Sequence, residues 1–160
     1  MQSRSSNRGG VMTNHEAFIE RAYVLARQAA VNGDHPFSAL LVHSGQIAME
    51  CLNTVNTHKD ATRHPELDIL RLAAADNALA PLDQMTLYAS TEPCAMCCGA
   101  IYWSGVQTLV YGCPTEVLGE IAGGSFVVPS RELFASATRD LNVIGPVLAE
   151  QGAEIHRSFW

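Results

Sequence analysis

The chain of 160 residues carries little positive charge. Lys59 is its only lysine, and ten cations in all face sixteen acidic residues, which gives a net charge of −6 at pH 7. Nucleic-acid backbones and anionic membrane surfaces are bound by clustered cations, so this composition argues against both kinds of partner. The chain also lacks an uninterrupted apolar stretch of about 20 residues, the length that a membrane-spanning helix needs.

Charged and aromatic residues are scarce as well, at 16% and 7%, whereas hydrophobic residues reach 48%. A chain with this balance can bury a core, which excludes a disordered protein. Its length suits one domain better than two. Because residues 1–12 are polar and rich in glycine without an apolar period, we expect a flexible tail there and a single domain over residues 13–160.

The five cysteines are odd in number, and three of them crowd together as Cys94, Cys97 and Cys98. No segment resembling a secretory signal precedes them. This pattern argues against a disulfide scaffold and predicts a reduced, cytoplasmic chain in which some thiols do chemistry. Cys51, Cys98 and Cys113 are expected to pack as buried apolar thiols.

Helices and strands are expected to alternate along the chain. Apolar residues at helical spacing predict a helix over residues 14–32, and two short apolar runs, 37–43 and 46–51, predict a hairpin. The remaining elements are expected as a helix over 65–79, a strand over 86–89, a helix opening at Pro93, a strand over 108–111, short helices near Pro114 and from Pro129, a strand over 141–144 and a short final helix. Helices between strands indicate an α/β sheet covered on both faces.

Two short segments carry the chemistry, His64-Pro65-Glu66 and Pro93-Cys94-Ala95-Met96-Cys97. Proline is favoured at the first position of a helix, so each segment is expected to open one. Cys94 and Cys97 would then lie in the first turn, where the positive end of the helix favours the thiolates that a metal requires. One histidine and two thiolates make a zinc site of the catalytic type, because a structural zinc would have four protein ligands.

Glu66 follows His64 by two residues and is expected to lie beside the metal without binding it. A carboxylate there can accept a proton from the zinc-activated water and deliver it to a substrate nitrogen. The combination H-x-E with P-C-x-x-C is the signature of the zinc deaminases.

These segments, together with Asn53 eleven residues before His64 and the run Gly99–Trp103, resemble the cytidine deaminase-like superfamily. Within it, the chain is most similar to the free-nucleobase branch and to bacterial guanine deaminases. The resemblance implies a three-layer α/β/α sandwich with a five-stranded mixed sheet, Zn²⁺ held by His64, Cys94 and Cys97, a homodimer, and hydrolytic loss of ammonia from a base.

The resemblance also implies residues that contact the substrate. Asn53 would hydrogen-bond the base, and Phe37 and Trp103 would line or support its pocket. The C-terminal segment, which ends in Trp160, would close over the ring.

Two positions depart from the guanine deaminase pattern. Pro65 has no backbone N–H, although the residue between the histidine and the glutamate typically donates one to the substrate. No acid occupies the stretch Gly123-Gly124-Ser125-Phe126, where guanine deaminases tend to carry one. The candidates to read the substrate instead are Glu116, Glu120, Glu154 and His156.

The sequence therefore predicts a zinc-dependent hydrolytic deaminase of a free aminated base, which could be guanine-like, cytosine-like, or a modified, aza or triazine analogue. A tRNA adenosine deaminase shares the motifs and is the alternative, disfavoured by the scarcity of cations. A non-enzymatic domain stabilised by zinc ranks lower.

Overall fold

The computed structural model describes residues 14–160, so the tail predicted over residues 1–12 lies outside the described part. At its centre is a five-stranded sheet in the order β2-β1-β3-β4-β5. β1 is antiparallel to both β2 and β3, whereas β3, β4 and β5 are parallel to one another. The strands are β1 (Ser38–His43), β2 (Gln46–Leu52), β3 (Thr86–Thr91), β4 (Thr108–Cys113) and β5 (Asn142–Ile144).

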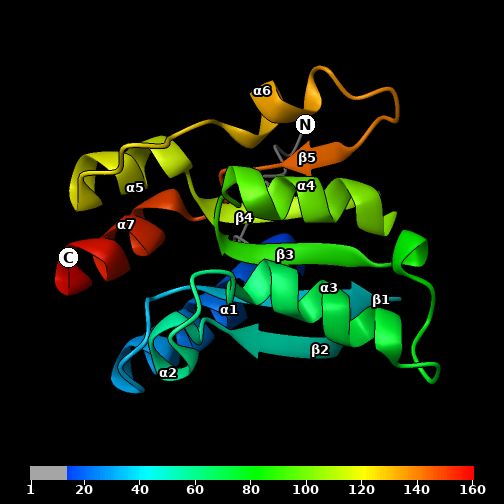
Figure 1. Cartoon of the computed structure of the whole chain (residues 1–160), viewed down its shortest axis with the longest axis horizontal. Coiled ribbons are helices and arrows are strands. Elements are labelled where there is room, and N and C mark those ends of the chain that lie inside the picture. Colours follow the sequence, from blue (N-terminus) through cyan, green and yellow to red (C-terminus); the bar gives the residue numbers. More distant parts are fainter. Residues whose placement is uncertain (1–13) are drawn as a thin grey trace, which may run out of the picture.

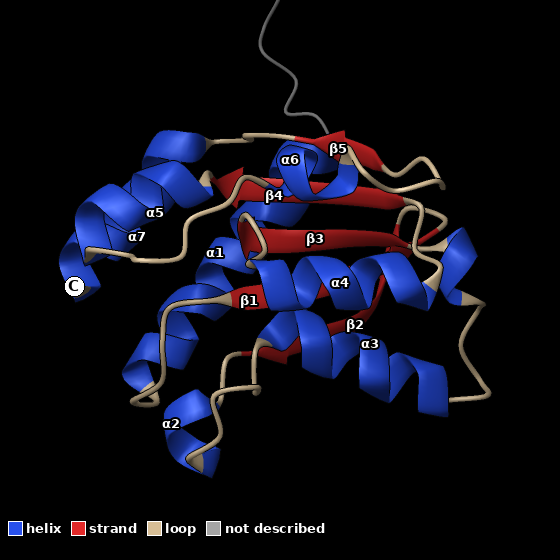
Figure 2. Cartoon of the chain, turned by 45° about the horizontal axis from the view of Figure 1, so that its top comes forward, coloured by secondary structure: helices blue, strands red, loops and turns tan. Residues whose placement is uncertain are grey.

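Helices cover both faces of this sheet (Figures 1 and 2). Those on one face are α1 (Asn14–Val31) and α7 (Ala149–Phe159), and those on the other are α3 (Pro65–Ala75) and α4 (Ala95–Ser104). The shorter ones are α2 (Val55–His58), a 3-10 turn (Leu82–Gln84), α5 (Thr115–Ala122) and α6 (Ser130–Phe134). The expected three-layer sandwich with a five-stranded mixed sheet is confirmed. Among residues 14–160, no helix is both long and apolar enough to cross a membrane.

The side chains of the central strands explain the two covered faces. In β1, Ala39 and Leu41 belong to the core under α3 and α4, whereas Leu40 and Val42 belong to the core under α1 and α7. Successive side chains of a strand point to opposite faces, so an apolar run without polar alternation must be buried on both.

One helix is shorter than expected. We predicted a helix over 65–79, but α3 ends at Ala75. The Asp76 carboxylate accepts a hydrogen bond from the backbone N–H of Ala78 at 2.9 Å. A short acidic side chain that bonds the backbone two residues on favours a turn over another helical turn.

One end of the sheet gathers the elements that matter for function. α3 and α4 both begin there, and α5 and α7 lie side by side at the same end, next to the C-terminus (Figure 1). The carboxyl ends of the parallel strands β3 and β4 meet at this edge as well. In open α/β sheets, ligands bind outside the carboxyl ends of the parallel strands, so this end is where a site is expected.

Candidate active site

Three potential metal ligands converge where α3 and α4 begin. His64 directly precedes α3, Cys94 directly precedes α4, and Cys97 is the third residue of α4. The Nδ1 atom of His64 lies 3.6 Å from the Sγ of Cys94 and 3.6 Å from the Sγ of Cys97. We predicted Cys94 inside the first helical turn, but the helix starts at Ala95 and Cys94 caps it.

This donor set fits a zinc ion. Zn–S bonds of about 2.3 Å and Zn–N bonds of about 2.0–2.1 Å at tetrahedral angles hold sulfur and nitrogen about 3.6 Å apart. Both observed distances have this value. Within residues 14–160 the group of donors comprises these three residues alone, and the neighbouring Cys98 thiol instead donates to the carbonyl of Pro93 at 3.4 Å. A zinc ion held by these three residues would keep a fourth position for water, as in a catalytic zinc site.

The charges of the two thiols are unequal. Hydrogen bonding from Cys97, and then from His64, lowers the pKa of Cys94 to about 4. The same Cys94 thiolate raises the pKa of Cys97, which burial raises further, and its contact with His64 raises the pKa of that imidazole. Without a metal, Cys94 is therefore a thiolate and Cys97 a thiol. A bound divalent cation would remove the proton of Cys97 as well, because a coordinating thiol loses its proton.

Glu66 lies beside the ligands without joining them. It is the second residue of α3 and only 4% exposed, and its Oε2 accepts a hydrogen bond from the Cys97 thiol at 3.7 Å. Burial raises the pKa of its carboxyl to about 7. A buried carboxyl next to the metal position can both take up and release a proton, as general acid–base catalysis requires.

A cavity of about 210 Å³ opens beside this cluster. Part of its lining, which we call the ligand side, comprises Phe37, three residues of the two motifs and the residue directly before the second motif: His64, Glu66, Cys94 and Glu92. The rest of the lining, which we call the wall, comes from α5, the loop after it and Trp160: Thr115, Leu118, Gly119, Ala122, Gly124, Phe126, Val127 and Trp160. The wall is almost entirely apolar.

The carboxylate of Glu92 joins the two sides. Its Oε2 accepts a hydrogen bond from the backbone N–H of Thr115 at 2.9 Å, and its Oε1 accepts two from Ser130, from the N–H at 2.7 Å and the hydroxyl at 2.6 Å. We call this arrangement the Glu92 clamp. Because both oxygens are engaged, this carboxylate holds the starts of α5 and α6.

The structure brings Phe37 and Trp160 to the cavity, whereas Asn53 lies behind its lining. Asn53 is buried, its backbone N–H donates to the carbonyl of Phe37 at 3.0 Å, and its Oδ1 accepts from the N–H of Val55 at 3.1 Å. With its oxygen engaged, the side chain of Asn53 has only its Nδ2 hydrogens left to offer a substrate.

Trp103 does not line this cavity within the described chain, and its role as a support of the pocket stays a prediction. Its side chain is 84% exposed and packs on Tyr102, with ring centroids 5.0 Å apart. α4 begins at the site, and eight residues further along a helix is roughly 12 Å away. The ring of Trp103 instead borders a separate hollow between α4 and α6.

The acids considered as readers of the substrate are absent from the lining as well. Glu116, Glu120 and Glu154 do not line the cavity, and Gly124 contributes only backbone there. His156 is buried behind the wall rather than in it. Sequence reasoning overlooked the apolar wall residues, because Leu118, Ala122 and Val127 look like any core residues until the fold places them.

A known family model matches the part of the chain that carries the two motifs. The family model described as the cytidine and deoxycytidylate deaminase zinc-binding region matches residues 12–113. This range includes His64, Glu66, Cys94 and Cys97 but ends before the wall begins at Thr115.

The curated relatives act on more than one kind of substrate, according to their names. The chain is 33% identical to the probable cytosine deaminase of Schizosaccharomyces pombe over 150 residues, which cover 90% of this chain and 91% of the relative. It is 42% identical to the guanine deaminase of Bacillus subtilis over 101 residues, 61% of this chain and 64% of the relative. It is 28% identical to tRNA-specific adenosine deaminase 2 of Xenopus tropicalis over 149 residues, 89% of this chain and 86% of the relative.

Solved structures extend the likeness over the whole fold. The guanine deaminase from Nitrosomonas europaea superposes with a TM-score of 0.79 at 26% identity, covering 93% of this chain and 86% of that one. A structure in complex with 2,6-diaminopurine superposes with a TM-score of 0.82 at 25% identity, covering 93% of this chain and 82% of that one.

Proposed function

The chain belongs to the cytidine and deoxycytidylate deaminase zinc-binding family, and from that premise we propose that it hydrolyses the amino group of a free heterocyclic base and releases ammonia. The observation that carries the proposal is the cluster of His64, Cys94 and Cys97, two of which line a small cavity together with Glu66. At about 210 Å³, the cavity lies below the range of roughly 300–1,000 Å³ typical of drug-sized ligands. It therefore suits a single small base.

The residues then have distinct roles. His64 Nδ1, Cys94 Sγ and Cys97 Sγ would hold Zn²⁺, which would supply Lewis-acid activation of water. Glu66 would take one proton from the attacking water and give it to the ring nitrogen beside the amino group. It would then take the second proton from the oxygen newly bonded to the ring carbon and give it to the amino group as the carbon–nitrogen bond breaks. Overall, a carbon–NH2 group and water become a carbon–oxygen group and ammonia. Phe37 and Trp160 hold the ring between them.

The lining narrows the choice of base. Pro65 donates no N–H, both oxygens of Glu92 are engaged in the clamp, and no acid stands at Gly124. Apart from the potential metal ligands and Glu66, the polar side-chain group that the described lining still offers is the Thr115 hydroxyl. A base that needs a carboxylate opposite its ring N–H groups would leave those groups unpaired, at a cost of about 1–3 kcal/mol. Modified, aza or triazine analogues are therefore included beside guanine and cytosine.

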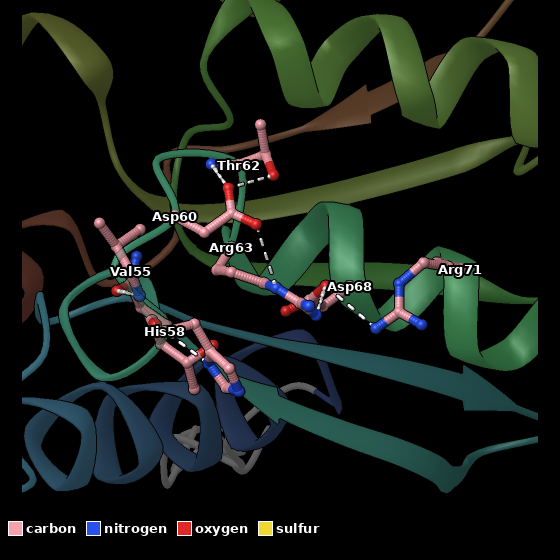
Figure 3. A network of polar contacts seen from close by, with 9 residues as sticks. Val55, His58, Asp60, Thr62, Arg63, Asp68 and Arg71 are labelled. Carbon is pink, nitrogen blue, oxygen red and sulfur yellow. Dashed lines mark hydrogen bonds and ion pairs between the residues drawn. The ribbon is translucent and has the colours of Figure 1, made fainter.

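The tRNA adenosine deaminases among the relatives make RNA the second candidate substrate. The arginines of residues 14–160 argue against RNA as the substrate, because most of them already form ion pairs or hydrogen bonds within the chain. Arg63 contacts Asp60 and Asp68 at 3.4 Å each, and Arg71 contacts Asp68 at 3.3 Å, as Figure 3 shows. The others so engaged are Arg21 with Glu50, Arg157 with Glu150 and Glu154, and Arg131 and Arg139 with backbone carbonyls. Cations held this way, in a chain of net charge −6, are poorly suited to a phosphate backbone.

The proposal extends to assembly and location. Residues 13–160 form one deaminase domain, and two copies pair through the outer face of α4. That face has no charged residue and exposes Met96 and Trp103, so two chains of net charge −6 can approach there without repulsion. The enzyme is cytoplasmic, because ligand thiols require a reducing compartment.

The decisive experiment is ammonia release from a panel of guanine, cytosine, 8-azaguanine, isocytosine, ammeline and melamine. Purified protein with one equivalent of zinc is expected to turn over at least one of them. Glu66→Gln is expected to keep its zinc and lose activity by about 10²–10⁴-fold.

The controls separate the competing functions. Turnover by Glu66→Gln at the native rate would remove Glu66 from the chemistry. Inosine formation in tRNA together with salt-sensitive binding, and no release from any free base, would transfer the function to the RNA alternative.

A further inference from the structure

His156 lies in α7. Of the four residues considered above as contacts of the substrate, namely Glu116, Glu120, Glu154 and His156, it is the buried one. Its side chain is 1% exposed. Nε2 lies 2.7 Å from the hydroxyl oxygen of Thr91, and the indole Nε1–H of Trp160 donates to Nδ1 at 3.2 Å. One imidazole thus links the carboxyl end of β3 to the last residue of the chain.

These contacts fix the state of the ring. An indole N–H can only donate, so Nδ1 of His156 is an acceptor and its proton resides on Nε2. That proton is donated to the Thr91 hydroxyl. Burial lowers the pKa of His156 to about 4, so the neutral form needed for both hydrogen bonds is present at neutral pH.

The ring of His156 also touches the substrate cavity indirectly. It packs against Phe37 with centroids 5.3 Å apart, and both Phe37 and Trp160 line the cavity. Thr91 lies three residues before Cys94 in the segment that supplies the ligands. We propose that His156 is a positioning residue for substrate binding, which fixes the Trp160 indole as the closing wall of the cavity in register with Phe37 and the ligand segment. This inference rests on the proposed function of the same cavity.

α7 itself does not depend on this histidine. At its start, the Tyr23 hydroxyl donates to the carbonyls of Leu148 and Val147, at 3.0 and 3.3 Å. Gly152 packs so tightly that a Cβ there would lie 2.6 Å from the Tyr23 hydroxyl. The helix is therefore anchored elsewhere, and what remains for His156 to hold is the indole of Trp160.

The Trp160 side chain has few other restraints. It is 47% exposed, and its further ring contacts are with Phe159 and His35, at 4.7 and 5.3 Å between centroids. A directed hydrogen bond from a buried partner is what gives this indole one orientation.

The test compares variants that remove one element of the contact at a time. His156→Phe keeps a ring against Phe37 but removes both hydrogen bonds, His156→Asn keeps an acceptor near the position of Nδ1, and Trp160→Phe keeps the aromatic wall without its N–H. One hydrogen bond is worth about 0.5–1.5 kcal/mol, so KM for the best base of the panel is expected to rise about 2- to 12-fold in His156→Phe and in Trp160→Phe. kcat stays within about twofold, and His156→Asn lies closer to the native KM than His156→Phe.

The double variant tests whether His156 and Trp160 act through the same contact. If His156 acts through the indole N–H, His156→Phe combined with Trp160→Phe raises KM no more than the larger single change does. Multiplied effects, or a fall in kcat at constant KM, would overturn the proposal.

A readout independent of turnover keeps this inference separate from the proposed function. In a Trp103→Phe background, Trp160 is the only tryptophan, and acrylamide quenching of its emission reports its mobility. His156→Phe is expected to raise the quenching constant while circular dichroism and zinc content stay native, even if no base of the panel is a substrate. Unchanged quenching in a folded His156→Phe would refute the positioning role, and loss of folded structure in both His156→Phe and His156→Asn would make the residue a structural one and refute it equally.

Discussion

The ligand side and the wall of the cavity differ in the polarity of their residues and in the part of the chain that supplies them. The ligand side consists of buried polar groups on two helix starts, with atoms 3.6–3.7 Å apart, and it lies within the part that the family model matches. The wall consists of apolar side chains from α5, the following loop and Trp160, beyond residue 113, where that match ends. The potential metal ligands thus lie inside the region that the family model matches, and the wall lies outside it.

The relatives named for cytosine, guanine and tRNA adenosine differ in the ring that their names give. In the proposed reaction the metal ligands and Glu66 act at the amino group, and the wall contacts the rest of the ring. Substitutions on the ligand side should therefore abolish the reaction, and substitutions on the wall should change KM or selectivity.

The largest effect is expected from removing a ligand. Cys97→Ala is expected to lose zinc and more than about 10³-fold of activity, because water without the metal keeps its pKa near about 16 instead of about 7. Cys98→Ala is the matched control, since burial holds the pKa of the Cys98 thiol at about 12 and its contact is with the Pro93 carbonyl. Zinc content measured by atomic emission checks both variants. Equal zinc loss in the two would show that the ligand set has been misassigned.

The wall should respond in binding rather than in chemistry. Stacking of a base on an aromatic ring is worth about 1–3 kcal/mol, so Trp160→Ala is expected to raise KM about 5- to 150-fold with zinc content unchanged. Phe159→Ala, one residue earlier and outside the lining, should change KM far less. A fall in kcat without a change in KM would place Trp160 in the chemistry and dissolve the distinction between the two sides.

Selectivity can be altered at Gly124. Gly124→Asp places a carboxylate at the wall and should favour guanine over cytosine about tenfold relative to Gly124→Asn, since a charged hydrogen bond is worth about 1.5 kcal/mol or more. A Cβ at this position would meet Val127 at 3.1 Å, and both variants share that cost. The ratio of kcat/KM values for the two bases is the measurement. Identical ratios in Asp and Asn variants would mean that this stretch does not read the base.

The smallest effect is expected away from both sides. Trp103→Ser removes an exposed side chain outside the cavity, so kcat/KM should stay within about twofold. If α4 pairs two copies as proposed, the mass measured by light scattering should fall from two chains to one. A large loss of activity in the monomeric variant would show that the partner copy contributes to the cavity.

Sequence reasoning located the ligand side because its residues are chemically rare and close in the chain. Two motifs of three and five residues identify the metal position, and helix-start prolines orient them. The error there was small: Cys94 caps α4 instead of lying inside it. The fold class could be predicted for a similar reason, because alternating apolar helices and strands permit few arrangements.

The wall could not be predicted in the same way. Leu118, Ala122 and Val127 are ordinary apolar residues, and only tertiary packing decides that they face the cavity instead of the core. Trp103 was assigned to the pocket only through the resemblance to the family, and in the described chain its side chain near the end of α4 is 84% exposed. His156 lacked a motif, and its two hydrogen-bond partners lie 65 and 4 residues away.

The Glu92 clamp bears on how such an enzyme could diversify. Two of its three hydrogen bonds come from backbone N–H groups, of Thr115 and Ser130, which every residue except proline supplies. The contact between Glu92 and the starts of α5 and α6 thus places little demand on the side chains at positions 115 and 130. Substitutions there other than proline would keep the two backbone donors, so α5 and its loop could change in sequence and still dock on this carboxylate, two residues before the first cysteine ligand.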